Sequence, residues 1–233
     1  MKKKILITGC QGNIGRIITA GLSDRYEIIG IDRKPITGES QIQLDIMGDA
    51  HELRNVCRGK DVIIHLAWDM SEDFPKETII PENKSMAERV LLLAIEEKIP
   101  RIIFASSVHA HEYPNPDGGL IDPTMLPIPD SPYGASKVYI EALSRYYARK
   151  KSIEIVCIRF GGVNENDEIR FSEDPQYDKV FLSKSDCVSL LTSCIETKKI
   201  PNNFGIIYGI SDVAGRMHSF ENVLHWRPNP AKK

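Results

Sequence analysis

The chain has 233 residues, 42% of them hydrophobic, which is enough for one globular domain with a substantial core. Thirty basic and 32 acidic residues leave a formal net charge of −2. This balance argues against a nucleic-acid or membrane surface, and no apolar run approaches membrane-spanning length. The five cysteines have no metal-ligand or Cys-x-x-Cys spacing, which predicts reduced thiols in a cytoplasmic protein and no metal site.

Strand and helix patterns alternate along the chain. The predicted strands are short apolar, β-rich runs at residues 5–8, 27–32, 41–44, 62–67, 102–105, 153–158 and 204–208. The predicted helices are amphipathic segments at residues 14–22, 49–56, 81–97, 132–150 and 186–197. This alternation predicts an α/β protein with a parallel sheet covered by helices on both faces. Ligands of such sheets bind at the carboxyl ends of the strands.

A glycine-rich segment at residues 8–15, Thr-Gly-Cys-Gln-Gly-Asn-Ile-Gly, follows the first strand and opens the first helix. In such a turn Gly9 allows the tight bend and Gly12 lets the backbone approach a pyrophosphate. Gly15 is expected to let helix and strand pack closely. The helix N-terminus behind the turn offers unpaired N–H groups to an anion. The motif indicates a dinucleotide site, although a glycine-rich turn without a ligand is a serious alternative for this motif alone.

The second strand ends in Asp32, at the distance from the glycine turn where a carboxylate meets an adenosine ribose. A carboxylate there favours NAD over NADP because it repels a 2′-phosphate. Arg33 and Lys34 follow directly and soften that preference. Asp45 and Ile46 follow the next short strand and are interpreted as flanking the adenine; a solvated loop aspartate is the alternative for Asp45.

The fourth strand ends in His65, Leu66 and Ala67. Leu66 and Ala67 are apolar, so a cofactor can lie against the backbone there, whereas His65 is interpreted as a packed strand residue. Asn83 lies near the start of the following long helix, where it either contacts the cofactor or caps the helix.

A possible catalytic set follows in the second half of the chain. Ser106 and Ser107 end the fifth strand, and Tyr133 and Lys137 lie one turn apart on the helix at 132–150. The lysine ammonium can stabilise a phenolate base, a serine hydroxyl can hold the substrate oxygen, and a nicotinamide can accept the hydride. For the tyrosine and lysine alone, an ordinary amphipathic helix is the default interpretation. Because the pair follows a glycine turn in the same chain, the two motifs together are strong evidence for a catalytic tyrosine beside a dinucleotide site.

These motifs predict a Rossmann-type doubly wound parallel sheet with a small C-terminal substrate lobe. We predict that residues 1–233 form a single NAD(P)-binding domain, in which residues ~160–233 contribute a reduced substrate-binding lobe. Residues 109–131 and 164–183 look irregular, and such long loops are either functional lids or surface connections.

Four motifs, taken in their order along the chain, resemble the extended short-chain dehydrogenase/reductases, the family that includes nucleotide-sugar epimerases and dehydratases. They are Thr-Gly-x-x-Gly-x-x-Gly from Thr8, His65-Leu66-Ala67, Ser106-Ser107, and Tyr-x-x-x-Lys from Tyr133. The resemblance runs from the first strand to at least Arg159. The segments Phe104-Ala-Ser-Ser-x-His, Ser183-x-x-Asp-x-Val-Ser-Leu and Trp226-Arg-Pro resemble uronate dehydrogenases more closely. Those enzymes oxidise C1 of a hexuronic acid to an aldarolactone with NAD. The short stretch after Lys137 agrees, because sugar-nucleotide enzymes of this family usually carry a larger C-terminal lobe.

The resemblance implies that Tyr133 is the proton acceptor and that Lys137 contacts both the nicotinamide ribose and Tyr133. The catalytic set is therefore Tyr133, Lys137 and Ser107. The cofactor contacts expected from motifs and resemblance together are Gly9, Gly12, Asn13, Ile14, Gly15, Asp32, Arg33, Asp45, Ile46, Leu66, Ala67, Asn83, Tyr133, Lys137 and Val163. The expected substrate contacts are Ser107, Val108, His109, Gly162 and Arg170. Arg170 falls about where the family places an arginine on the substrate carboxylate, with an exposed loop arginine as the alternative.

Three features depart from the uronate dehydrogenase pattern, and all lie on the substrate side. Val108 replaces an asparagine, Trp68-Asp69-Met70 replaces a small serine-containing segment, and residues 171–181 look longer than their counterpart. We therefore expect an NAD-dependent dehydrogenase acting at the anomeric carbon of a free sugar or sugar acid. The first alternative is a nucleotide-sugar epimerase or dehydratase that retains its NAD. The second alternative is a non-catalytic NAD-sensing regulator.

Apolar residues also suggest an oligomer. The run at 90–95, together with Val138, Ile140, Leu143 and Tyr146, has more apolar surface than one sheet face needs. Members of the family commonly pair these two helices across a dimer axis, so the sequence predicts a homodimer. Ordinary core packing is nearly as good an explanation.

Overall fold

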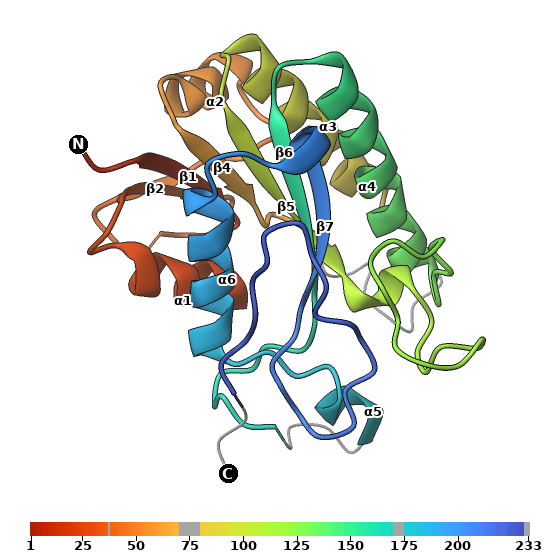
Figure 1. The fold of residues 1–233 in the computed structure, drawn as a ribbon. Coiled ribbons are helices and arrows are strands. Elements are labelled where there is room, and N and C mark those ends of the chain that lie inside the picture. The colour runs from red at the N-terminus through yellow and green to blue at the C-terminus, as the bar shows by residue number, and fades with distance from the viewer. Residues whose placement is uncertain (37, 70–79, 170–174, 231–233) are drawn as a thin grey trace.

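The computed structural model describes residues 1–36, 38–69, 80–169 and 175–230. Within these residues, seven strands form one parallel sheet of order β3-β2-β1-β4-β5-β6-β7 (Figure 1). The strands are β1 (Lys4–Thr8), β2 (Glu27–Asp32), β3 (Gln41–Gln43), β4 (Val62–His65), β5 (Arg101–Ser107), β6 (Glu154–Phe160) and β7 (Phe204–Gly209). The order reverses between β1 and β4, which is the point where open α/β sheets bind ligands.

Helices cover both faces of this sheet (Figure 1). Helices α1 (Asn13–Leu22) and α6 (Lys184–Glu196) pack together on one face. Helices α2 (Ala50–Cys57), α3 (Pro81–Glu96) and α4 (Pro132–Lys150) cover the other. The predicted α/β fold with its doubly wound parallel sheet is therefore confirmed. In the part of the chain that the structure describes, no helix is long and apolar enough to cross a membrane.

The sheet separates two apolar cores because successive strand residues point to opposite faces. Ile5 and Ile7 of β1 belong to the core under α1 and α6, whereas Leu6 belongs to the core under α2, α3 and α4. All three are fully buried, and burial of one such side chain contributes about 1.5–3 kcal/mol. Apolar residues on both faces explain why these strands read as continuous isoleucine and valine runs.

Some element boundaries differ from the prediction. Strands β5 and β6 extend to Ser107 and Phe160, because these two residues pair with each other at the carboxyl edge. Strand β4 ends at His65, two residues earlier than expected. The region 164–183, predicted to be irregular, contains the short helix α5 (Pro175–Asp178). Two single turns, η2 (Val108–Ala110) and η3 (Pro201–Asn203), also went unpredicted.

The C-terminal segment folds back onto α6. The carboxylate of Asp186, at the start of α6, accepts hydrogen bonds from the backbone N–H of Asn229 at 2.8 Å and from its side chain at 2.7 Å. Trp226 Nε1 donates to Ser189 Oγ at 3.0 Å. The Ser-x-x-Asp and Trp-Arg-Pro segments therefore contact each other, and their visible role is to fasten the C-terminal segment.

Candidate active site

A cavity of about 650 Å³ lies at the carboxyl edge of the sheet. It has two halves. The turn half comprises the glycine turn (residues 8–15), Asp32, and Leu66 and Ala67 after β4. The tyrosine half comprises Trp68, Ser107, His109, Tyr113, Tyr133, Lys137 and Tyr177. The predicted site residues that line this cavity are Gly9, Gly12, Asn13, Ile14, Gly15, Asp32, Arg33, Asp45, Ile46, Leu66, Ala67, Ser107, Val108, His109, Tyr133, Lys137, Gly162 and Val163. Arg170 lies outside the described residues.

The glycine turn is tightly constrained on one side and open on the other. Gly9 has φ 73°, and a Cβ there would lie 2.7 Å from the backbone nitrogen of Ala67, so the turn packs directly on the end of β4. At Gly12, Gly9 O at 3.2 Å is the one atom outside the neighbouring residues, among those described, that a Cβ would approach within 4 Å. A ligand phosphate can therefore reach this backbone, and the turn fits a dinucleotide.

Gly15 lies in the first turn of α1, close to the residues that directly follow β1. A Cβ at this position would lie 2.3 Å from Gly9 O and 2.8 Å from Cys10 Cα. A glycine is thus required where the first turn of α1 closes on the segment that leaves β1. Asn13 joins two distant segments, since its Nδ2 donates to Val163 O at 2.6 Å and links the turn to the chain after β6.

The carboxylate of Asp32 is held beside the turn by two backbone donors. Its Oδ2 accepts from Gln11 N and its Oδ1 from Lys34 N, each at 2.9 Å. The guanidinium of Arg33 pairs with Asp69 at 2.9 Å, which joins the loops after β2 and β4. A fixed carboxylate at this place suits ribose hydroxyls, and the charge of Arg33 is partly offset by Asp69.

Asn83 is not among the described residues that line the cavity, and its side chain does not cap α3. It is fully buried. Its Oδ1 accepts from Asp69 N at 2.6 Å and its Nδ2 donates to Asp69 O at 3.1 Å. An amide matches a backbone segment in this way because it carries both an acceptor and a donor. Asn83 therefore holds the loop that presents Asp69 to Arg33.

The first turn of α4 positions Tyr133 in the tyrosine half. Ser131 caps the helix by accepting from Gly134 N at 3.1 Å, and Pro132 fills the first helical position. A Cβ at Gly134 would lie 2.0 Å from His109 O, so only glycine lets α4 pack this closely on η2. The rings of Tyr133 and His109 consequently meet edge to face, with centroids 5.9 Å apart.

Lys137 lies one turn further along α4 and is almost completely buried. Its Nζ donates to Ala105 O at 3.3 Å and lies 5.3 Å from the ring centroid of Tyr133. The ring of Trp68 covers the ammonium, with 3.3 Å between Nζ and the ring centroid. The unusual tryptophan after β4 is therefore a direct neighbour of the lysine, an arrangement that stabilises the ammonium by a cation–π interaction.

The substrate-side polar residues are joined by short-range contacts. Ser107 Oγ accepts from His109 N at 3.2 Å, which caps η2. His109 Nδ1 lies 2.7 Å from Asp130 Oδ2, so this carboxylate orients the imidazole. Val108 is buried and lines the cavity between them. Asp130 was not predicted, and the only sequence signal for it is its place directly before Ser131, the cap of α4.

Tyr177 of α5 also lines the cavity and was missed by the sequence analysis. A Cβ at Gly162 would lie 2.4 to 2.6 Å from two ring atoms and the hydroxyl oxygen of its phenol group. Gly162 is thus the residue that lets this aromatic side chain form a wall of the tyrosine half. Tyr113 lines the same half from the other side, with its ring centroid 5.7 Å from that of His109.

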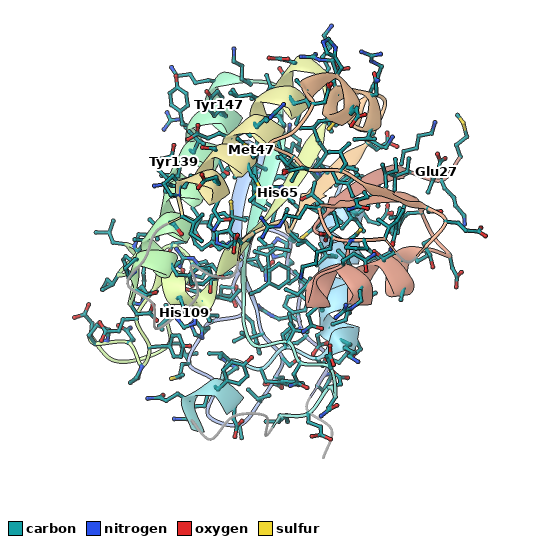
Figure 2. All side chains as sticks on the ribbon, turned by 180° about the vertical axis from the view of Figure 1, so that it is seen from behind. Glu27, Met47, His65, His109, Tyr139 and Tyr147 are labelled. Atoms are coloured by element: carbon teal, nitrogen blue, oxygen red, sulfur yellow. The ribbon has the colours of Figure 1, made fainter. Side chains whose placement is uncertain are left out.

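His65 has no direct part in the cavity wall. It lies within the sheet, whereas His109 lies beyond the carboxyl edge (Figure 2). Its Nδ1 lies 2.8 Å from Thr8 Oγ1. Burial, together with the charge of Lys137, lowers the pKa of His65 to about 3, so the ring is neutral. Within the described part of the chain, no three His, Cys, Asp or Glu side chains are grouped to hold a metal ion.

Comparisons with known proteins agree with this arrangement. The model of the NAD dependent epimerase/dehydratase family matches residues 5–163. The chain belongs to this family, which the glycine turn, Asp32 and the Tyr133–Lys137 pair had indicated.

Curated relatives and a solved structure cover nearly the whole chain. An NAD-dependent glucose-6-phosphate dehydrogenase from Haloferax volcanii is 28% identical, over 96% of this chain and 90% of its own. A uronate dehydrogenase from Pseudomonas putida is 30% identical, over 90% of this chain and 76% of its own. The crystal structure of a glucuronic acid dehydrogenase from Chromohalobacter salexigens superposes with a TM-score of 0.82 at 26% identity, covering 99% of this chain and 86% of that one.

Proposed function

We propose that this protein is an NAD-dependent dehydrogenase that oxidises the anomeric C1 hydroxyl of a free sugar or sugar acid. One observation carries the proposal: Tyr133, Lys137 and Ser107 line the same cavity as the glycine turn and Asp32. The relatives support it, because their names describe the oxidation of sugars that differ in charge.

In this proposal the turn half holds the cofactor. The backbone at Gly12 and the N-terminus of α1 bind the pyrophosphate, and Asp32 accepts hydrogen bonds from the adenosine ribose. When bound, NAD supplies the hydride acceptor. Asp32 favours NAD over NADP, since a 2′-phosphate would meet a fixed carboxylate.

The tyrosine half carries the proton chemistry. Tyr133 removes the proton of the C1 hydroxyl as general base, and Ser107 holds the same substrate oxygen. Lys137, whose ammonium lies near the tyrosine ring, stabilises the negative charge that develops on the phenolate. His109, oriented by Asp130, contacts a further hydroxyl of the sugar. Residues ~160–233 contribute a reduced substrate lobe through Gly162 and Tyr177.

The test is NADH formation by purified protein with NAD and a panel of neutral aldoses, phosphorylated aldoses and hexuronic acids. Turnover that is lost in Tyr133→Phe supports the proposal. A turnover limited to uronates and lowered by Arg170→Ala would assign Arg170 to the substrate carboxylate. Bound NAD without net NADH across the panel would favour the nucleotide-sugar epimerase or dehydratase. An unchanged phenotype and activity in Tyr133→Phe would favour a regulator.

We also propose a homodimer formed through α3 and α4. Leu92 on α3 and Tyr139 and Tyr146 on α4 are exposed by 43%, 40% and 56%. Large apolar and aromatic side chains that remain on the surface of two neighbouring helices suit an isologous contact. Light scattering at micromolar concentration tests this, and a monomer mass would remove the proposal.

A further inference from the structure

A third residue of α4 shares a face with Tyr133 and Lys137. Glu141 follows Lys137 by four positions, as Lys137 follows Tyr133, so the three side chains form one stripe along the helix. Glu141 is 3% exposed and lies behind the cavity rather than in its wall. It was not among the site residues predicted from the sequence.

The carboxylate of Glu141 is fully engaged by hydrogen-bond donors. Its Oε1 accepts from Ser106 Oγ at 2.6 Å and from Arg159 Nε at 2.8 Å. Its Oε2 accepts from Arg159 Nη2 at 2.8 Å, which completes a bidentate pair. Arg159 is completely buried, and its remaining guanidinium nitrogen donates to Tyr208 Oη at 2.6 Å.

Strand register explains why these groups meet. Ser106 of β5 pairs with Arg159 of β6, and Arg159 pairs with Tyr208 of β7. Lateral partners in a sheet point to the same face, here the face covered by α4. One carboxylate on the helix is therefore tied, directly or through Arg159, to three adjacent strands.

The location of this pair connects it with the chemistry. Ser106 immediately precedes Ser107, and Lys137 donates to the carbonyl of Ala105 just before it. Two successive turns of α4 are thus bonded to two successive residues of β5. A buried ion pair is weak evidence for stability, because the desolvation of its charges offsets much of the attraction. A role in positioning α4 on the sheet explains the location of the Glu141–Arg159 pair better.

We propose that Glu141 is a positioning residue that fixes α4 over β5, so that Tyr133 and Lys137 face Ser107. Arg159 holds the Glu141 carboxylate in place. This inference rests on the proposed dehydrogenase function. It predicts that loss of the carboxylate disturbs the reacting groups and leaves the distant turn half unchanged.

The test compares Glu141→Gln with a matched variant, Glu154→Gln. Glu154 pairs with the nearly buried Arg101, and these two residues start β6 and β5 at the opposite end of the sheet. For Glu141→Gln we expect kcat to fall about 10- to 100-fold per folded molecule, since small misplacements of reacting groups have effects of this size. The Kd for NAD should change less than about twofold, and Glu154→Gln should keep its kcat.

A readout that needs no turnover separates this inference from the proposed function. The protein has two tryptophans, and Trp226→Phe leaves only Trp68, whose ring lies on the Lys137 ammonium. In that background, Glu141→Gln should change the Trp68 emission and Glu154→Gln should not. This result would support the positioning role even if no sugar is oxidised. Unchanged emission together with unchanged kcat would overturn it.

A second variant covers the case in which Glu141→Gln does not fold. Replacing both partners by methionine, Glu141→Met with Arg159→Met, removes the buried charges together and is expected to restore folding. If this double variant folds with a low kcat and altered Trp68 emission, the hydrogen-bonded carboxylate is needed for position. If it folds with the normal kcat and normal emission, the inference is wrong.

Discussion

The two halves of the cavity are built in different ways. The turn half is mostly backbone: Gly9 and Gly12 shape it, and Asp32 is held by two backbone N–H groups. The tyrosine half is mostly side chains brought from separate loops, with His109 oriented by Asp130 and Tyr177 packed on Gly162. A backbone site can bind one cofactor in many proteins, whereas a side-chain site can change with each substrate. Of the departures from the uronate dehydrogenase pattern, Val108 and Trp68 line the tyrosine half, whereas Asp69 pairs with Arg33 beside the turn half.

The largest effect is expected from Tyr133→Phe, which breaks the tyrosine half alone. Removing the hydroxyl should lower kcat about 10²- to 10⁴-fold, the usual contribution of general base catalysis. The Kd for NAD should stay within about twofold, as measured by calorimetry. Tyr139→Phe is the matched control, since Tyr139 projects outward from the same helix (Figure 2). Equal losses in both variants would contradict the assignment of Tyr133.

Asp32→Ala should weaken cofactor binding in the turn half and leave the tyrosine half unchanged. Loss of the proposed ribose acceptor should raise the Kd for NAD about tenfold. Because the 2′-phosphate of NADP would no longer meet a carboxylate, the preference for NAD over NADP should narrow or reverse. Binding of each dinucleotide by calorimetry measures this. Asp61→Ala is the control, because Asp61 also accepts a backbone N–H, that of Lys4 at 2.7 Å, at the other end of the sheet. An unchanged ratio of the two affinities in Asp32→Ala would argue against a ribose contact.

Tyr177→Ala should enlarge the tyrosine half and leave the turn half unchanged. The wall over Gly162 would be lost, so the KM for the sugar should rise about tenfold while the Kd for NAD stays constant. Steady-state kinetics with the best substrate of the panel measures the change. Tyr146→Ala removes an exposed tyrosine of α4 and should leave KM unchanged. A rise in the Kd for NAD instead would place Tyr177 in the cofactor site.

The last effect concerns acid stability rather than activity, and two buried histidines, His65 and His218, contribute to it. Burial, with the nearby charges of Arg159 and His111, lowers the pKa of His218 to about 3, as burial and Lys137 do for His65. Both rings are neutral in the folded protein, whereas the unfolded chain takes up protons below about pH 6.5. Their contribution to stability is therefore present above pH 6.5 and is lost as the pH falls toward 3, with an effect on the order of a few kcal/mol.

His218→Phe tests this directly. Neither ring nitrogen of His218 has a hydrogen-bond partner among the described residues, and the ring packs on Tyr208 with centroids 4.4 Å apart. Phenylalanine keeps the ring contact but cannot be protonated, so the fall in Tm between pH 7 and pH 4 should be smaller than in the parent protein. His51→Gln, at an exposed histidine, should keep the full pH dependence. An unchanged slope in His218→Phe would show that this ring does not contribute.

The sequence by itself determined the features that depend on neighbours along the chain. The order of strands and helices, the glycine turn after β1, Asp32 at the end of β2 and the four-residue spacing of Tyr133 and Lys137 are all local patterns. Local patterns predict well because backbone geometry and helix periodicity relate residues only a few positions apart. The parallel sheet then brings the strand ends to one edge, which is why most predicted residues line one cavity.

Only the tertiary structure decided the contacts between distant segments. Asn83 meets the backbone of Asp69, Trp68 covers Lys137, and Tyr177 packs on Gly162. Glu141 meets Arg159 because helix α4 lies over a particular face and register of β5, β6 and β7. No local pattern specifies which helix face meets which strand position, because that choice depends on how the whole core packs.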